Sequence, residues 1–233
     1  MWGIDDDIYE DYYSGALSSS RKLWKFSSKE LKHIGIAMAA LIFAFSLPDS
    51  LCFGDFNLYS YLVTLVIMTI SVSTGFLLHE LGHKFTAQMY GCAAEFRYSK
   101  LGLALLILSG LTGFLIFAAP GAVMIFGSID TEKNGKISLA GPGTNAVLAA
   151  LFGFVSIPLG IMFGVNSLIY LIPYYVAYVN LMLGAFNMIP LYPLDGSKIF
   201  KWSVPVYIIT VIIFAILYFG LIAGNLVAWV LGS

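Results

Sequence analysis

Long apolar segments constrain this chain more than any other feature of its sequence. Five of them reach or approach the roughly 20 residues that an α-helix needs to cross the hydrocarbon core of a bilayer: 31–47, 59–88, 138–160, 167–190 and 204–224. Charged residues make up only 11% of the chain, whereas a soluble domain carries about a quarter. We therefore predict an all-α polytopic membrane protein with about five to six transmembrane helices.

The segments divide the chain into two parts. Residues 1–30 are predicted to form a polar cytoplasmic tail, and residues 31–231 a single transmembrane domain in contact with the lipid bilayer. A cleaved signal peptide that includes the apolar run 34–47 is the alternative for the first span. The chain has no long basic stretch with interleaved aromatic residues, so we expect no nucleic-acid partner. The sequence does not indicate an oligomeric state.

A sixth apolar stretch, 101–126, is interrupted by glycines and by Pro120. All twelve Lys and Arg residues lie at 21–32, 84–100, 133–136 and 198–201. Basic residues near the ends of spans mark the cytoplasmic side of a membrane. With a cytoplasmic N-terminus, all twelve lie on that side only if 101–126 enters and leaves the membrane at the same face. We therefore predict a re-entrant or strand-like segment there; an ordinary sixth span is the alternative.

The strongest local motif ends the second apolar segment, where His79, Glu80 and His83 form a His-Glu-x-x-His pattern. Histidines four residues apart share one helix face and can bind the same metal ion. A catalytic zinc takes three protein ligands and leaves a fourth position for water, from which Glu80 can accept a proton as general base. Two interior histidines hydrogen-bonded to neighbouring spans are the alternative. Charged residues inside a span are costly, which favours a functional site.

A third metal ligand has to come from elsewhere in the chain. His33 is the only other histidine, Glu95 and Asp130 lie in loops without a motif, and Asp195 follows a proline-rich turn after the span 167–190. Asp195 reaches the depth of the two histidines if only one crossing separates them, which again makes 101–126 re-entrant. A carboxylate that only caps a helix is the alternative for Asp195.

Three motifs in this order resemble the site-2 protease family of intramembrane zinc metalloproteases, in its archaeal form. They are the zinc motif, Gly-Pro-Gly-Thr-Asn at 141–145, and an Asn-x-x-Pro…Leu-Asp-Gly pattern at 187–196. The resemblance covers about residues 59–200. It implies one zinc ion bound by His79, His83 and Asp195, with Glu80 as catalytic base and a three-helix catalytic core at 59–88, 138–160 and 167–190.

The resemblance also predicts roles for two asparagines and an activity. Asn145 and Asn187 are expected near the cleft as substrate-binding or oxyanion residues, and we expect Asn187 to contact the substrate backbone or help stabilise an oxyanion. The expected activity is hydrolysis of peptide bonds in transmembrane protein substrates, at a site toward the cytoplasmic side of the cell membrane. A membrane metal transporter or sensor and a non-catalytic protease-like scaffold are the alternatives. Family members commonly carry further helices or regulatory domains that this sequence does not show.

Overall fold

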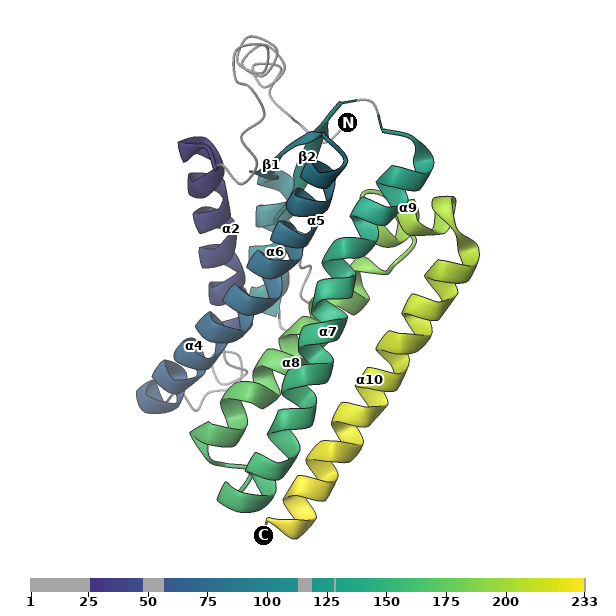
Figure 1. Cartoon of the computed structure of the whole chain (residues 1–233). Coiled ribbons are helices and arrows are strands. Elements are labelled where there is room, and N and C mark those ends of the chain that lie inside the picture. Colours follow the sequence, from purple (N-terminus) through teal and green to yellow (C-terminus); the bar gives the residue numbers. More distant parts are fainter. Residues whose placement is uncertain (1–25, 48–56, 113–118, 128, 233) are drawn as a thin grey trace.

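The computed structural model describes residues 26–47, 57–112, 119–127 and 129–232. In chain order, the helices and strands are α2 (Ser28–Ser46), α4 (Leu58–Val72), the π-helical turn η1 (Ser73–Leu77), α5 (Leu78–Met89), β1 (Ala93–Tyr98), α6 (Lys100–Thr112), β2 (Gly121–Phe126), α7 (Thr131–Phe163), α8 (Leu168–Asn187), α9 (Asp195–Trp202) and α10 (Val204–Leu231). The fold is an all-α bundle with one small two-stranded sheet, as predicted (Figure 1).

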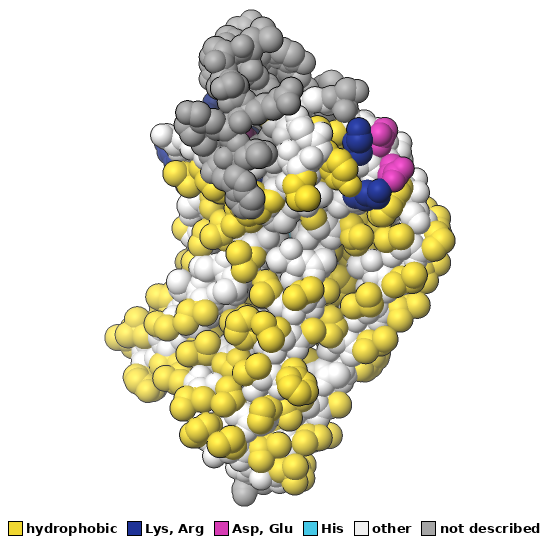
Figure 2. Space-filling view, in the orientation of Figure 1, with side chains coloured by type: hydrophobic (Ala, Val, Ile, Leu, Met, Phe, Trp, Pro, Cys, Tyr) yellow, Lys and Arg dark blue, Asp and Glu magenta, His cyan; other side chains and the backbone are white. Residues whose placement is uncertain are grey.

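Four helices in the described part of the chain are long and apolar enough to cross a membrane. They are the continuous unit of α4, η1 and α5 (Leu58–Met89), then α7, α8 and α10. Figure 2 shows hydrophobic side chains over most of the visible surface, with the visible Lys, Arg, Asp and Glu gathered at one end of the molecule. Helix α2, the first predicted span, has 19 residues, and its first turns carry Lys29, Glu30 and Lys32. Those charges shorten its apolar length relative to the other four.

Helix α7 lies at the centre of the bundle and packs against α5, α8 and α10 (Figure 1). It begins at residue 131, seven residues before the predicted span, because the Asp130 side chain accepts a hydrogen bond from the Lys133 amide and caps the helix. Gly82 brings α5 close to α7, since a Cβ at this glycine would lie 2.9 Å from the Ala140 carbonyl oxygen. The units α4–α5, α7 and α8 form the predicted three-helix core.

Strand pairing shows how the segment 101–126 is folded. β1 and β2 are antiparallel, and their register runs from Ala93 opposite Phe126 to Tyr98 opposite Gly121. The chain between the strands therefore leaves and returns at the same place. Helix α6 lies against α2, where a Cβ on Gly110 would be 2.8 Å from that of Ala44. With 13 residues, α6 is about 20 Å long, too short to cross a hydrocarbon core of about 30 Å. The predicted strand-like character is confirmed at Gly121–Phe126, and the antiparallel pairing fits a re-entrant path. The side of the membrane on which each end lies stays a prediction.

Candidate active site

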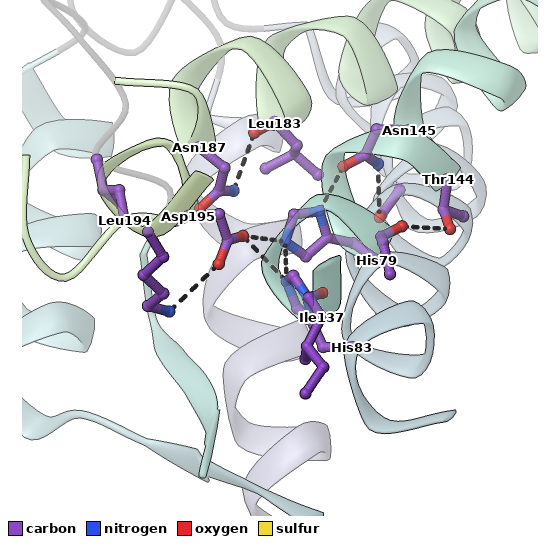
Figure 3. Close-up of polar contacts among 12 residues, drawn as sticks. His79, His83, Ile137, Thr144, Asn145, Leu183, Asn187, Leu194 and Asp195 are labelled. Carbon is purple, nitrogen blue, oxygen red and sulfur yellow. Dashed lines mark hydrogen bonds and ion pairs between the residues drawn. The ribbon is translucent and has the colours of Figure 1, made fainter. Parts of the chain in front are cut away.

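Three polar side chains from two distant parts of the chain converge between α5, α7 and α9. His79 and His83 lie one turn apart on α5, and Asp195 is the first residue of α9. The two histidine Nε2 atoms are 3.0 Å apart, and the Asp195 Oδ2 atom lies 3.4 Å from His79 Nε2 and 3.0 Å from His83 Nε2. All three residues are buried. In Figure 3 the three side chains point toward one another.

The hydrogen bonds behind the imidazole rings indicate which nitrogen of each ring donates to the protein and which one faces the centre. His83 Nδ1 lies 2.8 Å from the Ile137 carbonyl oxygen, which can only accept, so Nδ1 carries the proton. His79 Nδ1 lies 2.5 Å from Asn145 Oδ1, and the amide of the same asparagine donates elsewhere, which assigns the proton to Nδ1 again. With Nδ1 as the donor in each ring, Nε2 is the nitrogen available to bind a metal ion. Both Nε2 lone pairs therefore point at the same place as the Asp195 carboxylate.

Three converging acceptors of this kind fit a zinc ion. Tetrahedral zinc with bonds of about 2.0–2.1 Å holds its ligand atoms about 3.3–3.4 Å apart. The measured separations of 3.0–3.4 Å agree with that spacing. No other group of three or more His, Cys, Asp and Glu side chains in the described residues has ligand atoms close enough to hold a metal. Two imidazoles, one carboxylate and an open position are typical of a catalytic zinc site.

Two glycines make this arrangement possible. Gly141 on α7 faces both histidines, and a Cβ there would lie 2.4 Å from His83 Nε2 and 2.7 Å from His79 Nε2. Gly196 lets the turn before α9 fold tightly, because its Cβ would be 2.2 Å from the Met188 carbonyl oxygen. One glycine leaves room for a metal, and the other carries Asp195 back to the level of the histidines.

Asn145 lies behind the metal centre and is fully buried, with 0% of its surface exposed. Its Oδ1 atom contacts His79, while its Nδ2 atom donates to the Gly75 carbonyl oxygen at 3.0 Å and to Asn180 Oδ1 at 2.9 Å. Gly75 belongs to the π-helical turn η1, and such turns are frequent at functional sites. These contacts favour a role in orienting His79. The predicted contact of Asn145 with substrate stays a prediction.

Sequence reasoning missed Asn180. This residue is fully buried on α8, where its own amide donates to the Val176 carbonyl oxygen at 2.8 Å. It completes the hydrogen bonding of Asn145 from a helix 35 residues further along the chain. The sequence does contain a signal for it. An asparagine within a long apolar segment requires a polar partner from another part of the chain.

Glu80 lies beside the three converging side chains but does not join them. Its side chain is buried, and its Oε2 atom has no hydrogen-bond partner within the described residues. The backbone of Val123 in β2 is close enough to act on the Glu80 carboxyl group. A buried carboxylate with an oxygen that has no hydrogen-bond partner can take up and return a proton.

A cavity of about 340 Å³ opens onto this centre. It is lined by His79, Glu80, His83 and Asp195, by Asn187, and by strand β2 from Gly121 to Ile125. The Asn187 amide donates to the Leu183 carbonyl oxygen at 3.0 Å, which uses one of its two N–H groups. Asn187 therefore lies where a substrate could reach it, and its predicted role stays a prediction.

The rejected ligand candidates have other partners. His33 lines the same cavity but accepts a hydrogen bond from the Tyr98 amide at 3.3 Å. Glu95 pairs with Arg97 on β1, and Asp130 caps α7. Cys92 is a buried free thiol, and Cys52 lies outside the described residues.

The fold and the site together define a class of protein, a polytopic membrane protein with a buried histidine–carboxylate zinc centre. A protein of Methanocaldococcus jannaschii named “Putative zinc metalloprotease MJ0611” is 40% identical over 182 residues, which cover 78% of this chain and 88% of that protein. The chain belongs to this family of zinc metalloproteases, and zinc is the metal that its three converging ligands fit.

Two further relatives are longer proteins. “Zinc metalloprotease MJ0392” of the same organism is 28% identical over 145 residues, 62% of this chain and 35% of the relative. “Putative zinc metalloprotease Rip3” of Mycobacterium tuberculosis is 31% identical over 128 residues, 54% of this chain and 28% of the relative. The matched regions thus span about a third of these two proteins. No family model matches the chain, and no solved structure matches it.

Proposed function

We propose that this chain is an intramembrane zinc protease of the site-2 type, which hydrolyses peptide bonds in transmembrane protein substrates. One observation carries the proposal: both histidines of the histidine–carboxylate centre lie on a helical unit long and apolar enough to span a bilayer, Asp195 reaches them from α9, and a cavity opens onto the centre. Polar groups within membrane-spanning helices cost free energy, so a centre of this kind in such a helix indicates a function inside the membrane.

The chemistry divides between the metal and the protein. His79, His83 and Asp195 would hold zinc, which supplies a Lewis acid that polarises a carbonyl group and makes water more acidic. Glu80 takes the proton of the attacking water and returns it to the leaving amine. Asn145 keeps the His79 lone pair directed at the metal through the Nδ1 contact of 2.5 Å. Asn187, at the cavity wall, binds the substrate backbone as the peptide is cut.

A transmembrane helix satisfies its own carbonyl groups, so a substrate has to unwind locally before water can attack it. Strand β2 lines the cavity next to Glu80 and offers an edge to which an extended peptide can add as a further strand. We therefore expect substrates with helix-weakening residues near the cut. The basic residues at the ends of the helices support a cytoplasmic orientation for the site.

The test is cleavage of single-span peptides, carrying a proline or glycine within the span, by the purified protein in lipid vesicles. We predict cleavage within the apolar segment by the native protein and none by Glu80→Gln, with zinc content equal in both. The amide is nearly the size of the carboxylate but cannot accept the water proton. More than a few percent of native activity in Glu80→Gln would remove Glu80 from this role. Cleavage of soluble peptides alone would contradict the intramembrane assignment.

A further inference from the structure

The metal helix α5 carries a second buried charged residue that the chemistry above does not use. Lys84 follows His83 directly and is only 1% exposed. Its ammonium group lies 2.5 Å from Glu30 Oε2, and Glu30 is 0% exposed. Removing two charges from water costs several kcal/mol for each ion, so burial alone gives no reason to keep such a pair.

The position of Lys84 on the helix links it to the catalytic face. Lys84 is four residues after Glu80, so the two side chains leave α5 on the same side. Helix α5 packs there against both strands of the sheet. Lys84 also lies over the ring of Phe26, 4.0 Å from its centroid, just before α2 begins. The side of α5 that bears the general base is thus joined to the first turn of α2.

Glu30 has a second partner, and this partner is the sheet. Its Oε1 atom accepts a hydrogen bond from the Phe96 amide at 3.0 Å. One turn further along α2, His33 Nδ1 accepts from the Tyr98 amide. Both amides therefore point away from β2, toward α2. Helix α2 covers the outer edge of β1 with two side-chain acceptors.

In an antiparallel sheet, residue pairs that exchange backbone hydrogen bonds alternate with pairs that do not. The outward direction of the Phe96 and Tyr98 amides therefore also fixes the direction of the backbone groups opposite them on β2. Phe96 is opposite Val123, and Tyr98 is opposite Gly121. When one residue of such a pair turns its N–H outward, its partner does the same on the other side. The backbone groups of Val123 and Gly121 are therefore directed away from β1, and both residues line the cavity. The ring of Phe96 packs edge-on against Phe76 of η1, with centroids 5.4 Å apart.

We propose that Glu30 and Lys84 are positioning residues that set the place of the β2 edge relative to Glu80 and so align the substrate for cleavage. The ion pair with Lys84 holds Glu30 against α5, which carries the metal-binding histidines. The hydrogen bond from the Phe96 amide holds β1 against Glu30. The inference rests on the proposed function, since it takes the β2 edge as the docking strand of the substrate. It assigns helix α2, outside the three-helix core, a part in substrate binding.

Two double variants separate this role from plain stability. The first double variant, Glu30→Gln with Lys84→Gln, is called the Gln pair; the corresponding methionine variant is the Met pair. In the Gln pair the charges are gone, but an acceptor for the Phe96 amide and a hydrogen-bonding amide on α5 remain. In Glu30→Met with Lys84→Met, the acceptor is lost as well, and an apolar pair of similar volume is tolerated in many proteins. Lys136→Met, which breaks an exposed pair with Glu132, is the matched control.

The measurements are zinc content, kcat and KM for a cleaved peptide, and hydrogen exchange of the Phe96 amide. We expect the Gln pair and the control to stay near native in all of them. The Met pair should keep its zinc and most of its kcat, while KM rises about tenfold because substrate binding is lost rather than chemistry. Its Phe96 amide should exchange faster.

An unchanged KM and unchanged exchange in the Met pair would overturn the inference, and so would loss of its zinc. A Gln pair with the same KM as the Met pair would also overturn it, because the acceptor would then be irrelevant. If the native protein cleaves no peptide, the proposed function fails, but the exchange comparison still decides whether Glu30 holds the strand.

Discussion

At the scale of single residues, the site depends on the lack of a side chain at Gly141 as much as on the three residues that would bind the metal. This glycine leaves the space in front of both Nε2 atoms open, whereas a methyl group would lie 2.4 Å from one and 2.7 Å from the other. Gly143, two residues later on the same helix, has nothing within 4 Å of its would-be Cβ. The two glycines form a natural pair for comparison.

We predict that Gly141→Ala removes most of the bound zinc and the activity, because the added Cβ forces at least one histidine away from the metal. Gly143→Ala should bind zinc like the native protein. Metal content after gel filtration, read beside the unfolding temperature, checks both. Full zinc occupancy in Gly141→Ala would mean that the histidines do not face this glycine.

Asn145 provides a second prediction at this scale. Loss of a hydrogen-bond partner behind a metal-binding histidine typically lowers metal affinity or activity about 10–100-fold. Asn145→Ala should show a loss of this size in a zinc competition titration, and Asn180→Ala a smaller one, since it acts on His79 only through Asn145. Equal losses in both would indicate a general packing defect instead.

The residue scale also shows where sequence reasoning succeeds. Spacing within one helix places His79 and His83 on a common face, and a single crossing between them and Asp195 predicts its depth. Asn180 and Glu30 escaped notice because their partners are 35 and 54 residues away, and no local pattern marks such pairs.

At the scale of elements, the return of segment 101–126 toward its starting point was predictable because charges outside it restrict where its ends can lie. The pairing of β1 with β2 was not, because the apolar stretch between Lys100 and Phe126 has no clear alternation. Within its described residues, Lys100–Thr112 folds as α6 and Gly121–Phe126 as a strand. Both α6 and β1 pack against α2, and the local sequence does not report these contacts.

Labelling tests this topology. Single cysteines introduced as Ser99→Cys, Thr131→Cys and Ser203→Cys, in a background without Cys52 and Cys92, should all react with a membrane-impermeant thiol reagent only after intact cells are permeabilised. Three basic clusters near these positions predict a cytoplasmic side. Labelling of the residue 131 variant alone from outside would contradict the re-entrant arrangement.

At the scale of the whole molecule, the bundle holds a polar centre within an apolar exterior. The four long helices were predictable from hydropathy, and the pairing of His79 with His83 from their spacing. Asp195 was predictable only from the topology and the family resemblance. The cavity and the hydrogen bonds behind the histidines required the assembled structure. Their combination is what makes the chain a candidate for hydrolysis inside a membrane.

The most direct test of this account is X-ray absorption at the zinc edge of the purified native protein. We predict one zinc per chain, surrounded only by nitrogen and oxygen at about 2.0–2.2 Å, with the scattering pattern of two imidazoles. A spectrum with sulfur at about 2.3 Å, or with fewer than two imidazoles, would contradict the site built from His79, His83 and Asp195.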